Sequence, residues 1–237
     1  MHLSIPVLLL ATAITTLAAA LQTAIGMGMG LVAGPLLVMV SPGFVPGPTL
    51  CGVMALSGVI AWRERAAIDA AILRQSLLGL LLGSAIATVL LPVLIRIGLP
   101  QVFAVLILGA VGLSLSGVRI PAGRWALLIG GTASGVLGTL SGAHGPPIAL
   151  VLQHEAPARL RATLCAFFTV GCAIALAMLA VSGAFRASTA LAGVALLPGV
   201  GLGIMLGPRL ARYLDPRRGR IAVLAISALS ALALLFR

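Results

Sequence analysis

The sequence is dominated by long apolar segments that follow one another with only short breaks between them. A helix needs about 20 apolar residues to cross a bilayer, and repetition of such stretches along a chain is typical of a polytopic helical bundle. With 61% hydrophobic and 8% charged residues, the chain has more apolar surface than a soluble core can bury. The apolar segments lie at 3–25, 26–40, 49–62, 70–95, 101–118, 125–138, 139–153, 162–183, 188–208 and 220–236.

These segments predict an all-α fold, a polytopic transmembrane helical bundle with about 8–10 membrane segments. Segments 26–40 and 139–153 are short for a full crossing, and we interpret them as half-helices or re-entrant arms. The N-terminal segment lacks a positively charged start, and the apolar character continues beyond it. It therefore resembles a retained first helix more than a signal peptide.

The basic residues are all Arg, fifteen in number, and they lie mainly in the breaks between apolar segments. A net charge of +11 would suit a nucleic-acid partner, but the Arg residues form no basic stripe with interleaved aromatic side chains. Arg-rich breaks are instead the pattern that orients helices in a bilayer. We expect a multi-pass protein of the cell (inner or plasma) membrane, with the lipid bilayer as its partner and no nucleic acid.

The two halves of the chain share short motifs in the same order, which predicts an internal duplication into repeats at 1–118 and 119–237. The motif offsets lie between about 111 and 116 residues. The matches are Thr49-Leu50-Cys51 with Thr163-Leu164-Cys165, Gly34-Pro35 with Gly145-Pro146, and Gly79 and Gly83 with the glycines around Gly193 and Gly199.

The charges of equivalent breaks are opposite in the two halves. The break at 41–48 has no charge, whereas its counterpart at 154–161 has two Arg. The break at Arg63 and Arg65 is Arg-rich, and its counterpart has only Arg186. Two other breaks are Arg-rich: one contains Arg119 and Arg124, and one contains the Arg cluster at 209–220. The break at Arg96, the counterpart of that cluster, is poor in Arg. Opposite biases predict two inverted repeats, a recurrent transporter architecture.

Glycine-rich runs fall at matching places in both halves and predict the substrate site. The first is Gly26-Met-Gly28-Met-Gly30, followed by Pro35; the second runs from Gly142 through His144 to Gly145-Pro146. Glycine lets a helix break, and proline starts a helix well, so each run predicts the beginning of a half-helix inside the membrane. The free N–H groups of such a helix start bind anions. The alternative is close helix packing without a ligand.

Few polar side chains accompany these runs. We expect His144, Thr49 and Thr163 to contact the anion, although a Thr hydroxyl can equally bond to its own helix. Cys51 and Cys165 occupy equivalent repeat positions and are either small packing residues or thiols beside the site. The complete set of expected substrate-binding residues is Gly26, Gly28, Gly30, Pro35, Thr49, Gly142, His144, Gly145, Pro146 and Thr163.

Nothing in the sequence predicts catalysis, a cofactor or a metal. The carboxylates lie at segment ends or in loops, the three Cys form no CxxC, and the His residues lack metal-ligand spacing. A transporter of a small anion is the interpretation that the paired breaks favour. An anion channel or a non-transporting subunit of a membrane complex is the alternative, and the sequence leaves homo-oligomerisation open.

The ordered set of motifs resembles the TauE/SafE family of sulfite exporters over nearly the whole chain. The resemblance rests on the first Gly-rich run with Arg63, Arg65 and Asp69, and on a better-matching second half. That half contains Gly135-Val-Leu-Gly138, Gly142 to Pro147, Arg161-Ala-Thr163 and Gly207-Pro-Arg209-Leu-Ala-Arg212. Met27, Met29 and His144 depart from it, because glycine is common at those positions. The resemblance implies export or uptake of sulfite, sulfonates or related small anions. The inverted repeats predict that transport occurs by alternating access.

Overall fold

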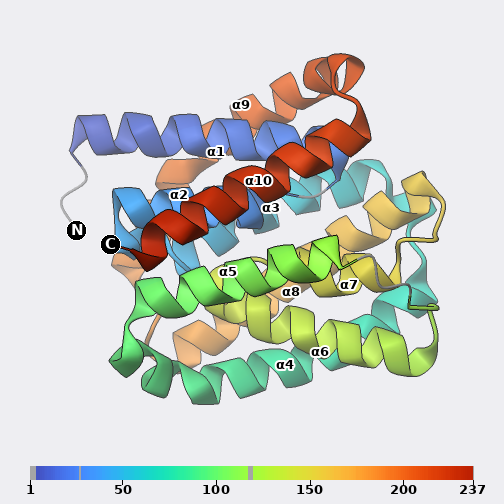
Figure 1. The fold of residues 1–237 in the computed structure, drawn as a ribbon, viewed down its shortest axis with the longest axis horizontal. Coiled ribbons are helices and arrows are strands. Elements are labelled where there is room, and N and C mark those ends of the chain that lie inside the picture. The colour runs from blue at the N-terminus through green and yellow to red at the C-terminus, as the bar shows by residue number, and fades with distance from the viewer. Residues whose placement is uncertain (1–3, 27, 117–119, 237) are drawn as a thin grey trace.

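The computed structural model describes residues 4–26, 28–116 and 120–236. Within these ranges the chain forms α-helices joined by turns and short 3₁₀ segments, with no strand, which confirms the all-α prediction. The helices are α1 (Ile5–Ile25), α2 (Met29–Val40), α3 (Gly47–Arg63), α4 (Ala70–Ile97), α5 (Leu99–Leu115), α6 (Arg124–Ser141), α7 (Gly145–Val151), α8 (Pro157–Val181), α9 (Ala187–Tyr213) and α10 (Pro216–Leu235). Most run roughly along one direction of the bundle (Figure 1).

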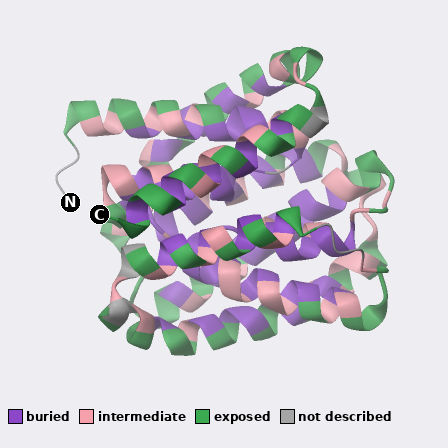
Figure 2. Cartoon of the chain, viewed as in Figure 1, coloured by how far each residue is buried: buried purple, intermediate pink, exposed green. Residues whose placement is uncertain are grey.

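Five helices of the described ranges are long and apolar enough to cross a membrane: Ile5–Ile25, Ala70–Leu94, Pro157–Val181, Ala187–Tyr213 and Arg218–Leu235. Their outward faces carry exposed aliphatic side chains such as Val89 and Val181, which are 76% and 89% exposed. Figure 2 shows the same division, with buried residues turned toward the middle of the bundle and exposed residues outward. Such an apolar exterior matches a lipid environment, so the chain is a membrane protein.

Glycines bring the longest helices into backbone contact. Gly79 and Gly83 of α4 lie against the carbonyl oxygens of Leu128 and Thr132 of α6, where a β-carbon would overlap them. On the opposite side of the bundle, Gly199, Gly203 and Gly207 of α9 lie against α1. Small residues four apart allow this approach in membrane helices. Many glycines of the chain therefore allow close helix packing, which is the alternative to a ligand-binding role that the sequence leaves open.

The packing partners also follow a pattern between the halves of the chain. Helix α1 packs against α9, and α6 packs against α4, so the first helix of each half lies on the fourth helix of the other (Figure 1). In the middle, α3 packs against α8, and α5 against α10. The two halves are thus interleaved rather than side by side as separate domains.

Helices α2 and α7 are too short to cross a bilayer. With a rise of 1.5 Å per residue, twelve residues span about 18 Å and seven about 10 Å, against a hydrocarbon core of about 30 Å. Each packs against the helix that precedes it, so α1–α2 and α6–α7 form two helical hairpins. The predicted segment 139–153 is divided differently from expectation, because residues 139–141 complete α6 and α7 begins only at Gly145.

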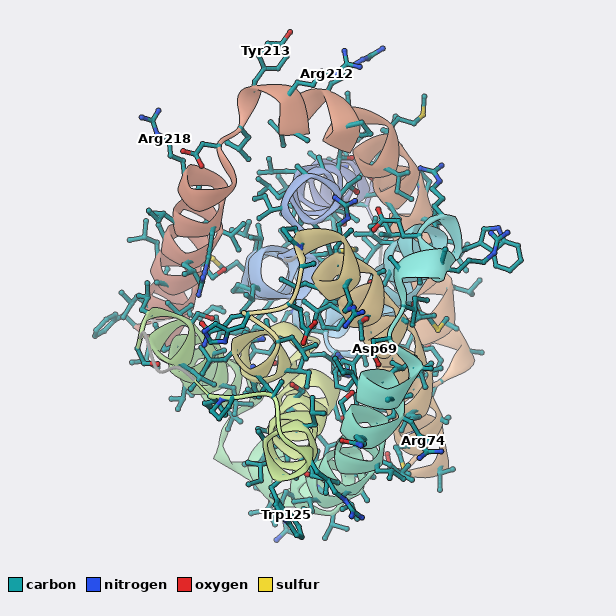
Figure 3. All side chains as sticks on the ribbon, turned by 90° about the vertical axis from the view of Figure 1, so that its right-hand side faces the viewer. Asp69, Arg74, Trp125, Arg212, Tyr213 and Arg218 are labelled. Carbon is teal, nitrogen blue, oxygen red and sulfur yellow. The ribbon has the colours of Figure 1, made fainter. Side chains whose placement is uncertain are left out.

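One end of the bundle carries the Arg-rich breaks. In the view of Figure 3, Arg212, Tyr213 and Arg218 project outward at the α9–α10 connection, and Asp69 and Arg74 lie near the start of α4. Two residues singled out in the sequence, Met27 and Arg119, lie outside the described residues.

Candidate functional site

A small cavity of about 20 Å³ lies where the two helix breaks meet. A cavity of about 10–15 Å³ holds one water molecule, so this space holds a water but no larger ion. In this structure the cavity is therefore too small for an oxyanion. The cavity is lined by Gln22, Gly28, Gly30, Leu31, Val53, Gly142, Ala143, His144, Gly145 and Phe168.

The first break, between α1 and α2, is stabilised by a side chain of α1. Helix α1 ends at Gly26, whose left-handed backbone (φ 90°) favours glycine. Four residues earlier, the buried Gln22 side chain accepts a hydrogen bond from the Met29 N–H at 2.9 Å and donates to Ser57 Oγ at 3.0 Å. Gln22 thus caps the start of α2 from a neighbouring helix and ties it to α3.

The start of α2 offers backbone donors to the cavity. The first four N–H groups of a helix have no acceptor within it. Here the Met29 N–H is bonded to Gln22, and the Val32 N–H to the Gly28 carbonyl. Gly30 and Leu31 line the cavity, at the positive end of a 12-residue helix.

The second break, between α6 and α7, also follows a glycine with a left-handed backbone, but it has fewer backbone N–H donors. Helix α6 ends at Gly142, which is also left-handed (φ 76°), and α7 begins at Gly145. Pro146 and Pro147 follow and have no N–H, while the Ile148 N–H donates to Ser134 Oγ at 3.1 Å. The two helix starts therefore differ, and α2 is the better donor of the pair.

Pro35 does not start a helix, contrary to prediction. Helix α2 begins at Met29, six residues earlier, because Gln22 caps it there, and Pro35 lies inside the helix. Pro146, in contrast, lies in the first turn of α7 as predicted. The sequence match between Gly34-Pro35 and Gly145-Pro146 therefore pairs positions that differ in the structure.

His144 is the one titratable side chain lining the cavity. It is 2% exposed, and its ring fits against Gly138 of α6 and Gly171 of α8, where β-carbons would meet the imidazole. Its Nδ1 lies 3.9 Å from the Cys172 sulfur. Among the described residues, Nε2 of His144 is a buried polar atom without a hydrogen-bond partner.

The two predicted threonines have different surroundings. Thr49 donates its hydroxyl to the Phe44 carbonyl at 2.9 Å, and its methyl group faces Gly142. Thr163 accepts a hydrogen bond from the Asp69 N–H at 3.0 Å. Asp69 caps α4 through the N–H groups of Ala71 and Ile72, so Thr163 supports that cap, away from the central cavity.

The cysteines lie in helix contacts. Cys165 and Cys172 of α8 are buried, and Cys51 of α3 lies against Gly193 of α9. These positions match the packing interpretation of Cys51 and Cys165. In the part of the chain that the structure describes, no three His, Cys, Asp or Glu side chains are grouped to bind a metal.

A second, larger cavity of about 480 Å³ lies beside the central one, and we refer to it as the vestibule. Gly26 and Pro146 line it, together with Arg161 and Arg220. Arg161 was not among the expected substrate-binding residues, but its aliphatic part lies against Gly26. The structure thus brings guanidinium groups closer to the Gly-rich runs than expected.

Of the ten expected substrate-binding residues, five line the central cavity: Gly28, Gly30, Gly142, His144 and Gly145. Gly26 and Pro146 line the vestibule instead. Sequence reasoning missed Gln22, Val53 and Phe168. A signal existed for Gln22, because an amide within an apolar segment needs a partner in the membrane.

Comparison with known proteins gives one match. A family model described as Sulfite exporter TauE/SafE matches residues 11–234. No curated protein and no solved structure matches the chain. Because the matched region covers nearly the whole sequence and contains both Gly-rich breaks, the chain belongs to the TauE/SafE family of membrane transport proteins.

Proposed function

We propose that this protein is a carrier of a small sulfur-containing oxyanion, such as sulfite or a sulfonate, that works by alternating access. The observation that carries the proposal is the central cavity between two helix breaks, with the donor-rich start of α2 on one side and Gly142 to Gly145 on the other. The family description supports the substrate class. Positive helix ends at interrupted membrane helices are typical anion sites in transporters.

We further infer that the two halves act as inverted repeats, at 1–118 and 119–237. The exchanged packing of α1 on α9 and α6 on α4 supports this arrangement, as does the pair of hairpins at equivalent positions. In such an architecture one set of elements rocks against the other around a fixed site. The small cavity then corresponds to a state between the two open ones.

The electrostatics of the central site favour an anion over a cation. Among the residues that the structure describes, no carboxylate lines the cavity. The Gly30 and Leu31 N–H groups lie at the positive end of α2, and the Gln22 amide holds that end in place. An anion with several oxygens can accept from more than one such donor at once.

Uptake of labelled sulfite into proteoliposomes tests the assignment of this site. The variants Gly28→Leu and Gly145→Leu alter two residues that line the cavity, and Gly28 has a left-handed backbone that disfavours a side chain. Both should reduce uptake by about tenfold or more, since small displacements in such sites have large effects. Gly201→Leu is the matched control, because a β-carbon there has no neighbour within 4 Å. Wild-type uptake by both cavity variants, in stably folded protein, would refute the site.

A further inference from the structure

The vestibule has the size of a ligand site rather than a packing defect. Its volume of about 480 Å³ lies within the range of about 300–1,000 Å³ that is typical of small-molecule sites. Its wall runs from Gly26 and Pro146, beside the central cavity, to Pro157 and Arg220 near the Arg-rich end of the bundle. Apolar side chains of α7 and α8 form much of this wall, with two guanidinium groups among them.

Arg161 is held in the vestibule by an ion pair. Its Nε donates to Glu64 Oε2 at 2.8 Å, and its Nη2 lies 2.7 Å from Glu64 Oε1. Both side chains remain partly open to solvent, at 41% and 26% exposed. A guanidinium binds two oxygens in this planar fork, and a sulfite or carboxylate ion offers the same pair of oxygens as Glu64.

Arg220 supplies a second charge. It donates from Nη2 to the Ser114 carbonyl at 2.8 Å, which is a neutral partner. The nearby Arg159 differs, because it lies 3.5 Å from both Asp69 and Glu155 and does not line the vestibule. The charge of Arg220 is thus available to an anion in the vestibule, whereas the charge of Arg159 is offset by two carboxylates.

We propose that the vestibule is an anion-capture site, in which a small soluble oxyanion replaces Glu64 on Arg161 and gains the charge of Arg220. The captured anion then passes Gly26 and Pro146 to reach the central cavity. The second step rests on the proposed transport function, but the first does not. Glu64 acts as an internal competitor that occupies the fork when no anion is present.

An anionic lipid headgroup has the same oxyanion chemistry as a soluble ion. We favour the soluble ion because the lining of the vestibule includes Pro157 and Arg220, near the starts of α8 and α10, and also Gly26 and Pro146, which are close in sequence to Gly28 and Gly145 of the central cavity. Calorimetric titration of sulfite into full-length protein distinguishes the two sources. The protein is compared in nanodiscs of zwitterionic lipid and in nanodiscs that contain anionic lipid.

The expected result is saturable sulfite binding in zwitterionic nanodiscs. Arg161→Gln and Arg220→Gln should each weaken it by about tenfold or more, as expected for a lost hydrogen bond to a charged group. Glu64→Gln should strengthen it several-fold, because the competitor is gone. Arg74→Gln and Arg212→Gln remove the same charge at the same end but do not line the vestibule, and they should leave the affinity unchanged (Figure 3).

Three results would overturn the capture site: wild-type affinity in both vestibule variants, an equal loss in the control variants, or loss of sulfite binding in nanodiscs that contain anionic lipid, which would assign the vestibule to a lipid headgroup. Unchanged or weaker sulfite binding by the Glu64→Gln variant would contradict the proposal that the anion replaces Glu64 on Arg161. Because size-exclusion profiles and melting temperatures accompany each variant, a misfolded protein is recognised. Gly28→Leu, which alters the central cavity, should fail in uptake while the sulfite binding that remains is still weakened by Arg161→Gln and Arg220→Gln, so failure of capture and failure of transport give different outcomes.

Discussion

Gly30 lies against the carbonyl oxygen of Gly142, so the two helix breaks touch backbone to backbone. A β-carbon on Gly30 would overlap that oxygen, and neither partner can rotate away, because both are main chain. This contact joins the α1–α2 hairpin of the first half to the α6–α7 hairpin of the second. Any movement that opens the central cavity must therefore change it.

Gly30→Ala is expected to abolish or strongly reduce sulfite uptake. The added methyl group separates the hairpins and displaces the start of α2, which we expect to lower uptake by about tenfold or more. Uptake by proteoliposomes measures the effect. Gly109→Ala is the control, since a β-carbon at that position of α5 has no neighbour within 4 Å. Equal activity of the two variants would show that the contact is dispensable.

Gln22→Leu is expected to impair transport more than it impairs expression or folding. The substitution removes the acceptor of the Met29 N–H and the donor to Ser57 at once. Each buried group left unpaired costs about 1–3 kcal/mol. Ser57→Ala, which loses only one of these bonds, should have a smaller effect on uptake. The reverse order of the two variants would contradict the capping role of Gln22.

Gly138→Ala is expected to have an effect that overlaps that of His144→Ala. The alanine methyl group would occupy the position of the imidazole, so the ring is displaced. Uptake measured for both single variants and the double variant gives a coupling free energy, which we expect to exceed about 0.5 kcal/mol. Additive effects of the two substitutions on uptake would mean that the position of the His144 ring does not depend on Gly138.

Gly83→Val is expected to lower the melting temperature in detergent. A side chain there meets the Thr132 carbonyl of α6, and overpacking of this kind costs about 1–3 kcal/mol. Gly112→Val on α5 is the matched control, because a β-carbon there has no neighbour within 4 Å. A similar melting temperature for both variants would contradict the close α4–α6 packing.

The sequence predicts the all-α membrane class well because hydropathy responds directly to the bilayer. Both helix breaks at the Gly-rich runs are present, since a glycine with positive φ is needed at Gly26 and Gly142 to end α1 and α6. The start of α2 was not predictable from Pro35. A side chain of α1, Gln22, sets it; the amide within an apolar segment indicates that Gln22 needs a partner, but the sequence does not identify the Met29 N–H as that partner.

The predicted site residues likewise differ in whether the local sequence determines their positions. Glycines at the breaks reach the cavity because local conformation places them there, whereas Thr163 was predicted from its hydroxyl group and its repeat position. Its hydroxyl instead accepts from Asp69, a residue 94 positions away. The role of Arg161 likewise depends on Glu64 and on the contact with Gly26, which join segments distant in the sequence.

Sulfite counterflow by the purified wild-type protein tests the carrier proposal most directly. Proteoliposomes are loaded with unlabelled sulfite, and a trace of labelled sulfite is added outside, with sulfonates, sulfate and thiosulfate as competitors. A carrier predicts transient accumulation of label above equilibrium, with competitors ranked by their fit to the site. Passive equilibration without this overshoot, or no uptake of any anion by folded protein, would contradict alternating access and favour a channel or a non-transporting subunit.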